Sequence, residues 1–243
     1  IRYTGNPPAS LALANAKDRA RDALAAAGVP VAGGFAVQAL EDLPERATDW
    51  PVTPPCFVKP ARTDASIGID QASVCKTFAD VRSRVAWLLA SVEGPILVEE
   101  YVPGDEINVA IFPDPVTGHV IPTRIDFSGY PAGYSPIVTY ACKWHEDSPE
   151  YCAMSHPCRD ALGHDLATRI DHVARAAFRA LGLTAYGRVD IRLDRRGQPR
   201  VIDVNPNNDI HPEAGMCVAA RSEGIDHATL VLQIALHGLH VRS

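Results

Sequence analysis

The chain has 243 residues, 47% of them hydrophobic, which is enough to bury one large core or two small ones. Its 23 basic and 29 acidic residues give a net charge of −6, which argues against nucleic acid as the main partner. No apolar run is long enough to cross a membrane, no secretory signal pattern is present, and the six cysteines form no CxxC pair, so we expect a cytoplasmic protein with reduced thiols.

The first half of the chain is predicted to combine short strands with two helices. Residues 10–27 are rich in alanine and indicate a helix, with Ser10 as its N-cap and Gly28 as its stop. An amphipathic helix is expected at 77–91. Strands are expected at 29–37, 56–59, 71–74, 95–101 and 106–112. A Pro-Gly pair separates the last two strands, which predicts a β-hairpin.

The second half predicts further antiparallel strands and a long helix. Strands are expected at 119–127 and 137–144, and a hairpin in the stretch GRVDIRLDRRGQPRVIDVNPNN, residues 187–208. The longest helix is expected at 159–181, followed by helices around 218–221 and from the cap Asp226 to 237. Because antiparallel hairpins are mixed with packed helices, the predicted fold class is α+β.

The hairpin at 187–208 carries an unusual set of polar side chains. Residues two apart share one face of a strand, so Arg188 and Asp190 can point one way together, and so can Asp203 and Asn205. Two carboxylates and an amide oxygen would then converge beside a guanidinium, which is an oxygen-rich site for hard divalent cations. A solvated sheet face or a buried Arg–Asp pair is the alternative.

Two lysines are candidates for binding an anion. Lys59 ends an apolar strand and precedes a loop of small residues, so its ammonium and the loop amides can reach one phosphate. Lys17 on the first helix gives a weaker signal. The alternative for Lys59 is a side chain that extends to solvent at a strand end.

Two glutamates flank the Pro-Gly turn. Glu99 and Glu106 are seven residues apart, and pairing of the two strands would bring both carboxylates to one end of a cleft. There they could accept hydrogen bonds from an exocyclic amine or from ribose hydroxyls. An acidic surface hairpin is the alternative. Lys143 offers another cation at the end of the strand expected at 137–144.

The cysteines suggest a different reading. Cys152, His156 and Cys158 lie close together in the sequence, with His145 near, so a zinc-binding structural domain is conceivable. Their spacing fits no common ligand pattern. No ordered base accompanies any cysteine, which argues against a covalent cysteine enzyme.

The order of the motifs resembles the ATP-grasp fold. The resemblance rests on Lys17, FVKP at 57–60, EEYVPGDEINVAI at 99–111, CKW at 142–144 and GRVDIRL…VIDVNPN from Gly187. Within this fold the chain looks most like the D-alanine–D-alanine ligase group of carboxylate–amine ligases. The resemblance covers most of the chain.

The resemblance implies two α+β subdomains that clasp ATP. It places a helical lead-in at 1–28, a small subdomain at 29–104 and a large C-terminal subdomain at 105–243. D-alanine ligases carry an additional N-terminal domain that contributes to the first substrate site, and the resemblance implies that this chain begins after it. The implied cofactors are ATP and Mg²⁺, with Mn²⁺ as a substitute. The implied partners are a small-molecule carboxylate and an amine, such as an amino acid or a peptide, and a homodimer is compatible with it.

The resemblance also implies a role for each site residue. The implied nucleotide contacts are the phosphate ligands Lys17 and Lys59, the adenine contacts Glu99, Tyr101 and Val102, the ribose ligand Glu106, and Ile202. The implied metal ligands are Asp190, Asp203 and Asn205. Lys143 would hold the γ-phosphate, and Arg188 would stabilise the reacting carboxylate or the tetrahedral oxyanion.

Several positions depart from the family pattern. Asp203 stands where the family often has Glu, and Ala65 lacks the hydroxyl of the family's Gly-Ser-Ser loop. The Pro-Gly-Met-Thr-Ser pattern after the metal-binding Asn is replaced by residues 206–216. We therefore expect a substrate other than D-alanine, with His211 and Glu213 as candidate contacts.

The sequence thus predicts an ATP- and Mg-dependent ligase that forms a peptide or amide bond through an acyl phosphate. The alternative is a non-catalytic nucleotide-binding or regulatory module of the same fold.

Overall fold

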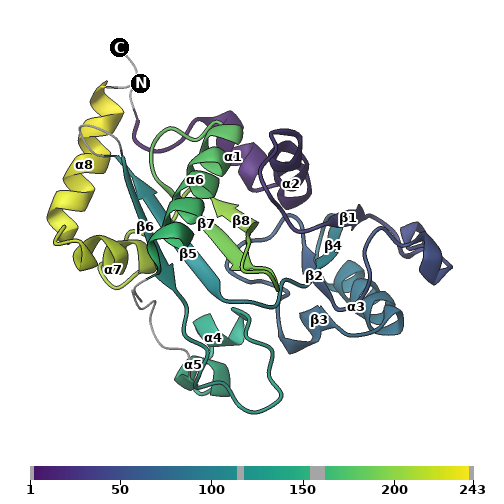
Figure 1. Cartoon of the computed structure of the whole chain (residues 1–243). Helices are drawn as coiled ribbons and strands as arrows, with labels where there is room; N and C mark the ends of the chain where they lie inside the picture. The colour runs from purple at the N-terminus through teal and green to yellow at the C-terminus, as the bar shows by residue number, and fades with distance from the viewer. Residues whose placement is uncertain (1–2, 114–117, 154–161, 241–243) are drawn as a thin grey trace.

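Two four-stranded antiparallel sheets stand side by side in the computed structural model, which describes residues 3–113, 118–153 and 162–240 (Figure 1). The first sheet has the order β1-β4-β2-β3, with strands β1 (Gly34–Val37), β2 (Cys56–Pro60), β3 (Val74–Cys75) and β4 (Ile96–Glu100). The second has the order β6-β5-β7-β8, with strands β5 (Glu106–Phe112), β6 (His119–Arg124), β7 (Gly187–Leu193) and β8 (Pro199–Asn205). The predicted α+β class is confirmed.

Helices cover these sheets. They are α1 (Pro8–Ala14), α2 (Lys17–Ala26), α3 (Phe78–Ser91), α4 (Ala141–Trp144), α5 (Pro149–Ala153), α6 (His164–Ala180), α7 (Gly215–Ser222) and α8 (His227–His240). In Figure 1, α3 lies on the first sheet, α6 crosses the second, and α7 and α8 lie beyond β6. Within the described residues, no helix has the length and apolar character needed to cross a membrane.

The first sheet is held by its packing on α3. Thr77 and Asp80 form a reciprocal capping box at the start of this helix, so its first backbone N–H groups are satisfied. Val81, Val85 and Leu88 then bury one face of α3 against the strands. The opposite face of this sheet carries the polar side chains of Lys59 on β2 and Glu99 on β4.

The second sheet has one apolar face and one divided face. Val109 and Val189 belong to the face that packs on α6. On the opposite face, Ala110 and Phe112 pack near α7 and α8, while Glu106 and Asn108 lie at the other end of β5. Alternation along one strand therefore gives a core at one end and polar groups at the other.

A β-bulge in β8 orients its polar residues. The pairing with β7 passes from Asp190 opposite Asp203 to Ile191 opposite Val201, which leaves Ile202 without a partner residue. Strict alternation would put Asp203 on the same face as the buried Val201. The extra residue reverses the face, so that Val201 and Val204 stay in the core while Asp203 does not.

The β-hairpin predicted between the strands at 95–101 and 106–112 does not form. β4 lies between β1 and β2, and β5 lies between β6 and β7, so neither has a free edge for the other. Gly104 instead packs against the end of β7, where its N–H donates to Leu193 O at 2.9 Å. A Cβ at Gly104 would lie 2.2 Å from that oxygen, so only glycine allows this close approach.

Other predicted elements also differ from the structure. The strand expected at 71–74 is a 3₁₀ turn at Gln71–Ser73, which leads into the short strand β3. The single helix at 10–27 is two helices, because the chain breaks at Ala16 and Lys17 N donates to Ala61 O. Ser10 is no N-cap, since its hydroxyl donates to Gly182 O. The strand expected at 137–144 does not form: residues 137–140 are irregular, and Ala141–Trp144 form the short helix α4. The long helix begins at His164, and residues 159–161 of its predicted span lie outside the described residues.

Candidate active site

A cleft of about 790 Å³ lies between the two sheets. Of the predicted site residues, only His211 does not line it. Those that do are Lys17, Lys59, Glu99, Tyr101, Val102, Glu106, Lys143, Arg188, Asp190, Ile202, Asp203, Asn205 and Glu213. Residues from 17 to 213 therefore meet in one place.

Lys59 and Glu99 form an ion pair inside the cleft. They come from the neighbouring strands β2 and β4, and Lys59 Nζ lies 2.9 Å from Glu99 Oε2. The same ammonium donates to the carbonyl of Ile202 at 2.8 Å, which the bulge makes available. A lysine ammonium has three donors and a carboxylate several acceptor sites, so each partner retains capacity for a ligand.

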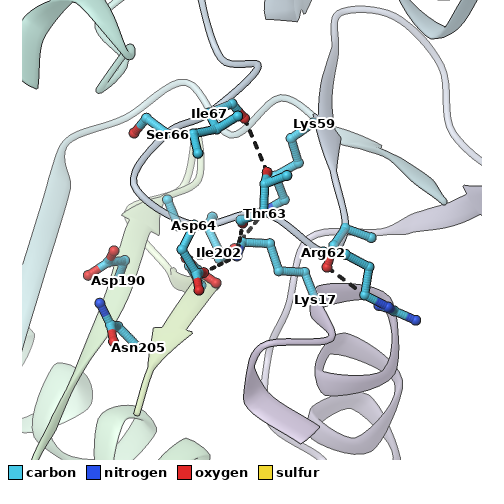
Figure 2. Close-up of polar contacts among 12 residues, drawn as sticks. Lys17, Lys59, Arg62, Thr63, Asp64, Ser66, Ile67, Asp190, Ile202 and Asn205 are labelled. Carbon is cyan, nitrogen blue, oxygen red and sulfur yellow. Dashed lines mark hydrogen bonds and ion pairs between the residues drawn. The ribbon is translucent and has the colours of Figure 1, made fainter. Parts of the chain in front are cut away.

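Lys17, at the start of α2, lies beside the loop that follows Lys59 (Figure 2). Its ammonium donates to Thr63 O at 2.8 Å and to Asp64 Oδ1 at 3.0 Å, and it lies 3.9 Å from Asp203 Oδ2. Burial alone would lower the pKa of Lys17, but Asp203, Asp64 and Asp190 outweigh it and raise the pKa above its ordinary value. Lys17 is therefore a cation at neutral pH.

Arg188 and Asp190 lie on one face of β7, as the alternation predicts. Arg188 donates from Nε and Nη2 to the two oxygens of Asp190 at 2.6 and 2.8 Å, a bidentate geometry. Asn108 on β5 adds a third hydrogen bond to Asp190 Oδ1. Burial alone would lower the pKa of Arg188, but Asp190 outweighs this and raises it.

Asp203 is ionised by its surroundings. Burial alone would raise the pKa of its carboxyl, but Lys17, Lys59 and Arg188 outweigh that effect and hold the pKa below its ordinary value. Its side chain is 31% exposed, so it is open to the cleft. A carboxylate in this position can accept a cation.

The donor set fits a magnesium ion. Asp190 and Asp203 are directly opposite on β7 and β8, and Asn205 lies two residues further on, opposite Arg188. Asn205 Oδ1 accepts one hydrogen bond, from Asn207 N, which leaves it a second acceptor site. Carboxylate and amide oxygens suit Mg²⁺, which keeps several waters and needs only one or two protein carboxylates. In residues 3–113, 118–153 and 162–240, no three His, Cys, Asp or Glu side chains form a metal-ion group.

The suggested zinc ligands are not brought together by any described contact. Cys152 is exposed, and its thiol is near the carbonyl of Glu146. His156 and Cys158 lie outside the described residues.

A buried arginine organises the other end of the cleft. Arg192 donates to Val102 O, Gly104 O and Pro136 O, and its Nη1 lies 3.0 Å from Glu106 Oε2. Its guanidinium also lies 5.4 Å from the ring centre of Tyr101. Burial raises the pKa of Glu106, and Arg192 opposes that rise.

Lys143 reaches the cleft from a helix and not, as expected, from a strand end. Burial lowers the pKa of Lys143, and Arg188 lowers it further, although Asp190 opposes both effects. The indole Nε1 of the next residue, Trp144, donates to Ala65 O at 3.1 Å. This short helix therefore contacts the small-residue loop that follows Lys59.

The loop after β8 forms the remaining wall. Glu213 lies on the cleft and is exposed, with Arg221 3.5 Å from its carboxylate. His211 is turned away, and its Nδ1 accepts from the backbone N–H of Glu213 at 3.3 Å. Asn207, Asn208 and Asp209 line the cleft beside Glu213.

Arg192, Asn108 and Asp64 are among the cleft residues that were not predicted. Arg192 follows Arg188 and Asp190 by the same step of two, so extending that alternation once more would have found it. Asn108 stands in the same relation to Glu106. Asp64 lies in an irregular loop, where no periodicity indicates its direction.

The chain is similar to known ligases over nearly its whole length. The family described as D-ala D-ala ligase C-terminus matches residues 24–235. A D-alanine–D-alanine ligase of Marinomonas sp. (strain MWYL1) is 30% identical over 235 residues, which cover 96% of this chain and 68% of that protein. One of Nitrosomonas eutropha is 29% identical over 234 residues, covering 96% and 70%.

The fold is similar to that of a solved ligase. The crystal structure of D-alanine–D-alanine ligase from Bacillus anthracis complexed with ATP matches with a TM-score of 0.79 at 21% identity, covering 100% of this chain and 72% of that one. This likeness confirms the predicted ATP-grasp fold. Because the family match spans most of the chain, this protein belongs to the D-ala D-ala ligase C-terminus family and is an ATP-grasp ligase, a class of enzyme that uses ATP with Mg²⁺.

Proposed function

We propose that this protein joins a carboxylate to an amine through an acyl phosphate, and that its substrates are not two molecules of D-alanine. The observation that carries the proposal is the meeting of Lys17, Lys59 and Lys143 with the Arg188–Asp190 pair and Asp203 in one cleft. Three lysines and an arginine beside two carboxylates suit a nucleotide triphosphate and its metal ion.

The nucleotide would lie across the gap between the sheets. Lys17 and Lys59 would contact the phosphates, because both side chains line the cleft and are largely buried. Glu99 would accept from the adenine amine with the oxygen that Lys59 leaves free. The backbone of Tyr101 and Val102 would lie at the ring edge.

The ribose part of the nucleotide site is supported by buried contacts. Glu106 would accept from the ribose hydroxyls, while Arg192 holds its other oxygen in place. Ile202 would offer an apolar surface, since it lines the cleft beside Asp203. These contacts would fix the position of the base while the phosphates stay reachable by the lysines.

The reacting groups would meet over β7. Asp190, Asp203 and Asn205 would hold the magnesium ion, which supplies positive charge to the phosphates when bound. Lys143 would hold the transferring phosphoryl group. Arg188 retains donors beyond the two used by Asp190, and these would stabilise the oxyanion that forms when the amine attacks the acyl carbon.

The loop at 206–216 supports a different amine substrate. Its cleft-lining side chains include Asn207, Asn208, Asp209 and Glu213, which are amides and acids. These groups favour a substrate that presents hydrogen-bond donors or a second positive charge. Glu213 would contact that group directly. His211 would act through Glu213, whose backbone it accepts from.

The domain division and the assembly are further parts of the proposal. The lead-in at 1–28, the small subdomain at 29–104 and the large subdomain at 105–243 are supported by the separation of the two sheets between β4 and β5. Exposed Leu232 and Leu236 on α8 support a homodimer, which light scattering of the purified protein would measure.

The decisive experiment follows product formation from ATP. We expect ADP and phosphate to be released only when a carboxylate and an amine are both present. AMP and pyrophosphate would contradict the acyl-phosphate route, and ATP binding without turnover would indicate a non-catalytic module.

A screen of matched amines tests the substrate class. D-alanine, an amino-acid amide and a diamino acid would be compared at one concentration with a common set of acids. We expect the amine with an extra donor or charge to be preferred over D-alanine. A preference for D-alanine would overturn this part of the proposal.

A further inference from the structure

A carboxylate of the protein itself contacts one of the phosphate lysines. Asp64 belongs to the loop Pro60–Ile69 that follows Lys59, and its Oδ1 lies 3.0 Å from Lys17 Nζ. The Lys17 side chain is only 10% exposed, whereas that of Asp64 is 66% exposed. Figure 2 shows Asp64 beside Lys17, with Asp190 and Asn205 on the strands nearby. An anion thus already lies where a phosphate oxygen would reach the lysine.

The start of the loop is fixed to α2, which keeps Asp64 close. Ala61 O accepts from Lys17 N, Thr63 O accepts from Lys17 Nζ, and Arg62 pairs with Asp18. These contacts hold the residues just before Asp64. The carboxylate at the loop tip is therefore held near Lys17.

The tip of the loop is conformationally strained. Ala65 has φ +56° and Ser66 has φ +60°, in the left-handed region that is unfavourable for a residue with a Cβ. Contacts outside the loop offset that cost: Asp64 with Lys17, Trp144 Nε1 with Ala65 O, and Ser66 Oγ with Val138 O. The Asp64 contact is the one a phosphate would compete for.

We propose that Asp64 is an internal counterion of the phosphate site, which competes with a nucleotide phosphate for Lys17 and so weakens nucleotide affinity. This inference rests on the proposed role of Lys17. A phosphate that binds Lys17 competes with the Asp64 carboxylate for the ammonium. The phosphate is also repelled by this carboxylate, which has the same sign of charge. Both effects depend on the charge of Asp64 and on the phosphates of the ligand, but not on the nucleoside.

The test compares three ligands with the full chain by calorimetry. ATP with magnesium, ADP with magnesium, and adenosine are titrated into the wild type and into Asp64→Asn, without acid or amine. We expect Asp64→Asn to bind ATP roughly threefold to tenfold more tightly, the effect of removing one competing ion pair and one repulsion. Adenosine should bind both proteins equally.

Two further variants control for charge. Asp64→Glu keeps the counterion and should bind ATP as the wild type does. Asp22→Asn removes an equal charge from an Arg21–Asp22 pair of similar exposure, 17% and 70%, outside the cleft, and should leave ATP affinity unchanged.

The outcomes separate the two proposals. Equal or weaker ATP binding by Asp64→Asn overturns the counterion role while leaving the nucleotide site in place. Equal tightening of ATP and adenosine also overturns it, because the effect would then not involve the phosphates. If neither protein binds ATP, the proposed function fails and the counterion role fails with it.

Discussion

Lys59 Nζ and Glu99 Oε2 are 2.9 Å apart in a cleft where each side chain is only 6% exposed. The two residues would bind opposite ends of the nucleotide, the lysine its phosphates and the glutamate its adenine. Their contact joins the two parts of the proposed nucleotide site. Because a buried charge without a partner is costly, each residue also holds the other in position.

This pair predicts strong coupling between two substitutions. Lys59→Met or Glu99→Gln alone should lower the free energy of unfolding by about 3 kcal/mol, because each leaves a buried group without its partner. The double variant should cost clearly less than the sum of the two. Urea unfolding of the four proteins measures the coupling. Additive losses would show that the interaction between the two side chains contributes nothing to stability.

Part of this cleft could be predicted from local sequence alone. The hairpin at 187–208 was found because apolar residues alternate on both sides of a turn, and Gly197 adopts φ +71° there. Asp194 closes the turn by accepting from Arg196 N and Gln198 N. Alternation of period two also placed Arg188 with Asp190.

The remainder depended on contacts between distant segments. The hairpin predicted between β4 and β5 does not form, because both edges of each strand are already paired with other strands of its sheet. A Pro-Gly pair in the sequence does not show which strands will pair. The bulge at Ile202 is likewise set by which face of β8 meets α6. The position of Asp64 depends on Lys17, which lies 47 residues earlier in the chain.

The carboxylate at position 203 should be required for turnover. Asp203→Asn should lower the turnover number by at least about 100-fold, because the neutral amide supplies less charge to the metal and phosphates. Asp203→Glu is the matched control: it keeps the charge and adds one methylene, and should retain most activity. Turnover is followed by ADP release. Full activity of Asp203→Asn would remove Asp203 from the metal set.

The same residue predicts a dependence of stability on pH. Since the folded-state pKa of Asp203 is lowered, its ionisation stabilises the fold above the unfolded value of about 3.9 and this stabilisation is lost as pH falls through the folded pKa. The stability difference between wild type and Asp203→Asn should thus be constant above about pH 5 and change in favour of the variant below about pH 4. Denaturant melts from pH 7 to pH 3 measure it. A difference that does not vary with pH would contradict the lowered pKa.

The Lys143 ammonium should lower the free energy of unfolding while being needed for turnover. Burial and Arg188 disfavour its charged form in the folded protein, so Lys143→Met should be more stable at pH 7, while turnover should fall by at least about 100-fold. The cost of the charge is present below the folded pKa and vanishes above the unfolded value of about 10.4, so the stability gain should shrink as pH rises toward 10.

A surface lysine provides the control for Lys143. Lys76 is exposed and lies outside the cleft, so Lys76→Met removes the same charge without relieving burial. It should change neither turnover nor the free energy of unfolding by a comparable amount. A Lys143→Met protein less stable than the wild type at pH 7 would show that the ammonium is held by favourable contacts.

Arg192 should hold the adenine end of the cleft against β7, the strand that carries Asp190. From β7 it donates to Val102 O and Gly104 O in the segment between the sheets, and it pairs with Glu106. Arg192→Lys keeps the charge but loses the planar set of donors, so buried carbonyls lose their partners. We expect a loss of about 2 kcal/mol or more in stability and weaker binding of adenosine as well as ATP. Arg200→Lys on β8, where the arginine is 41% exposed in its pair with Asp194, should change neither. If Arg192→Lys weakened ATP but left adenosine binding intact, the arginine would act on the phosphates and not on the base and ribose.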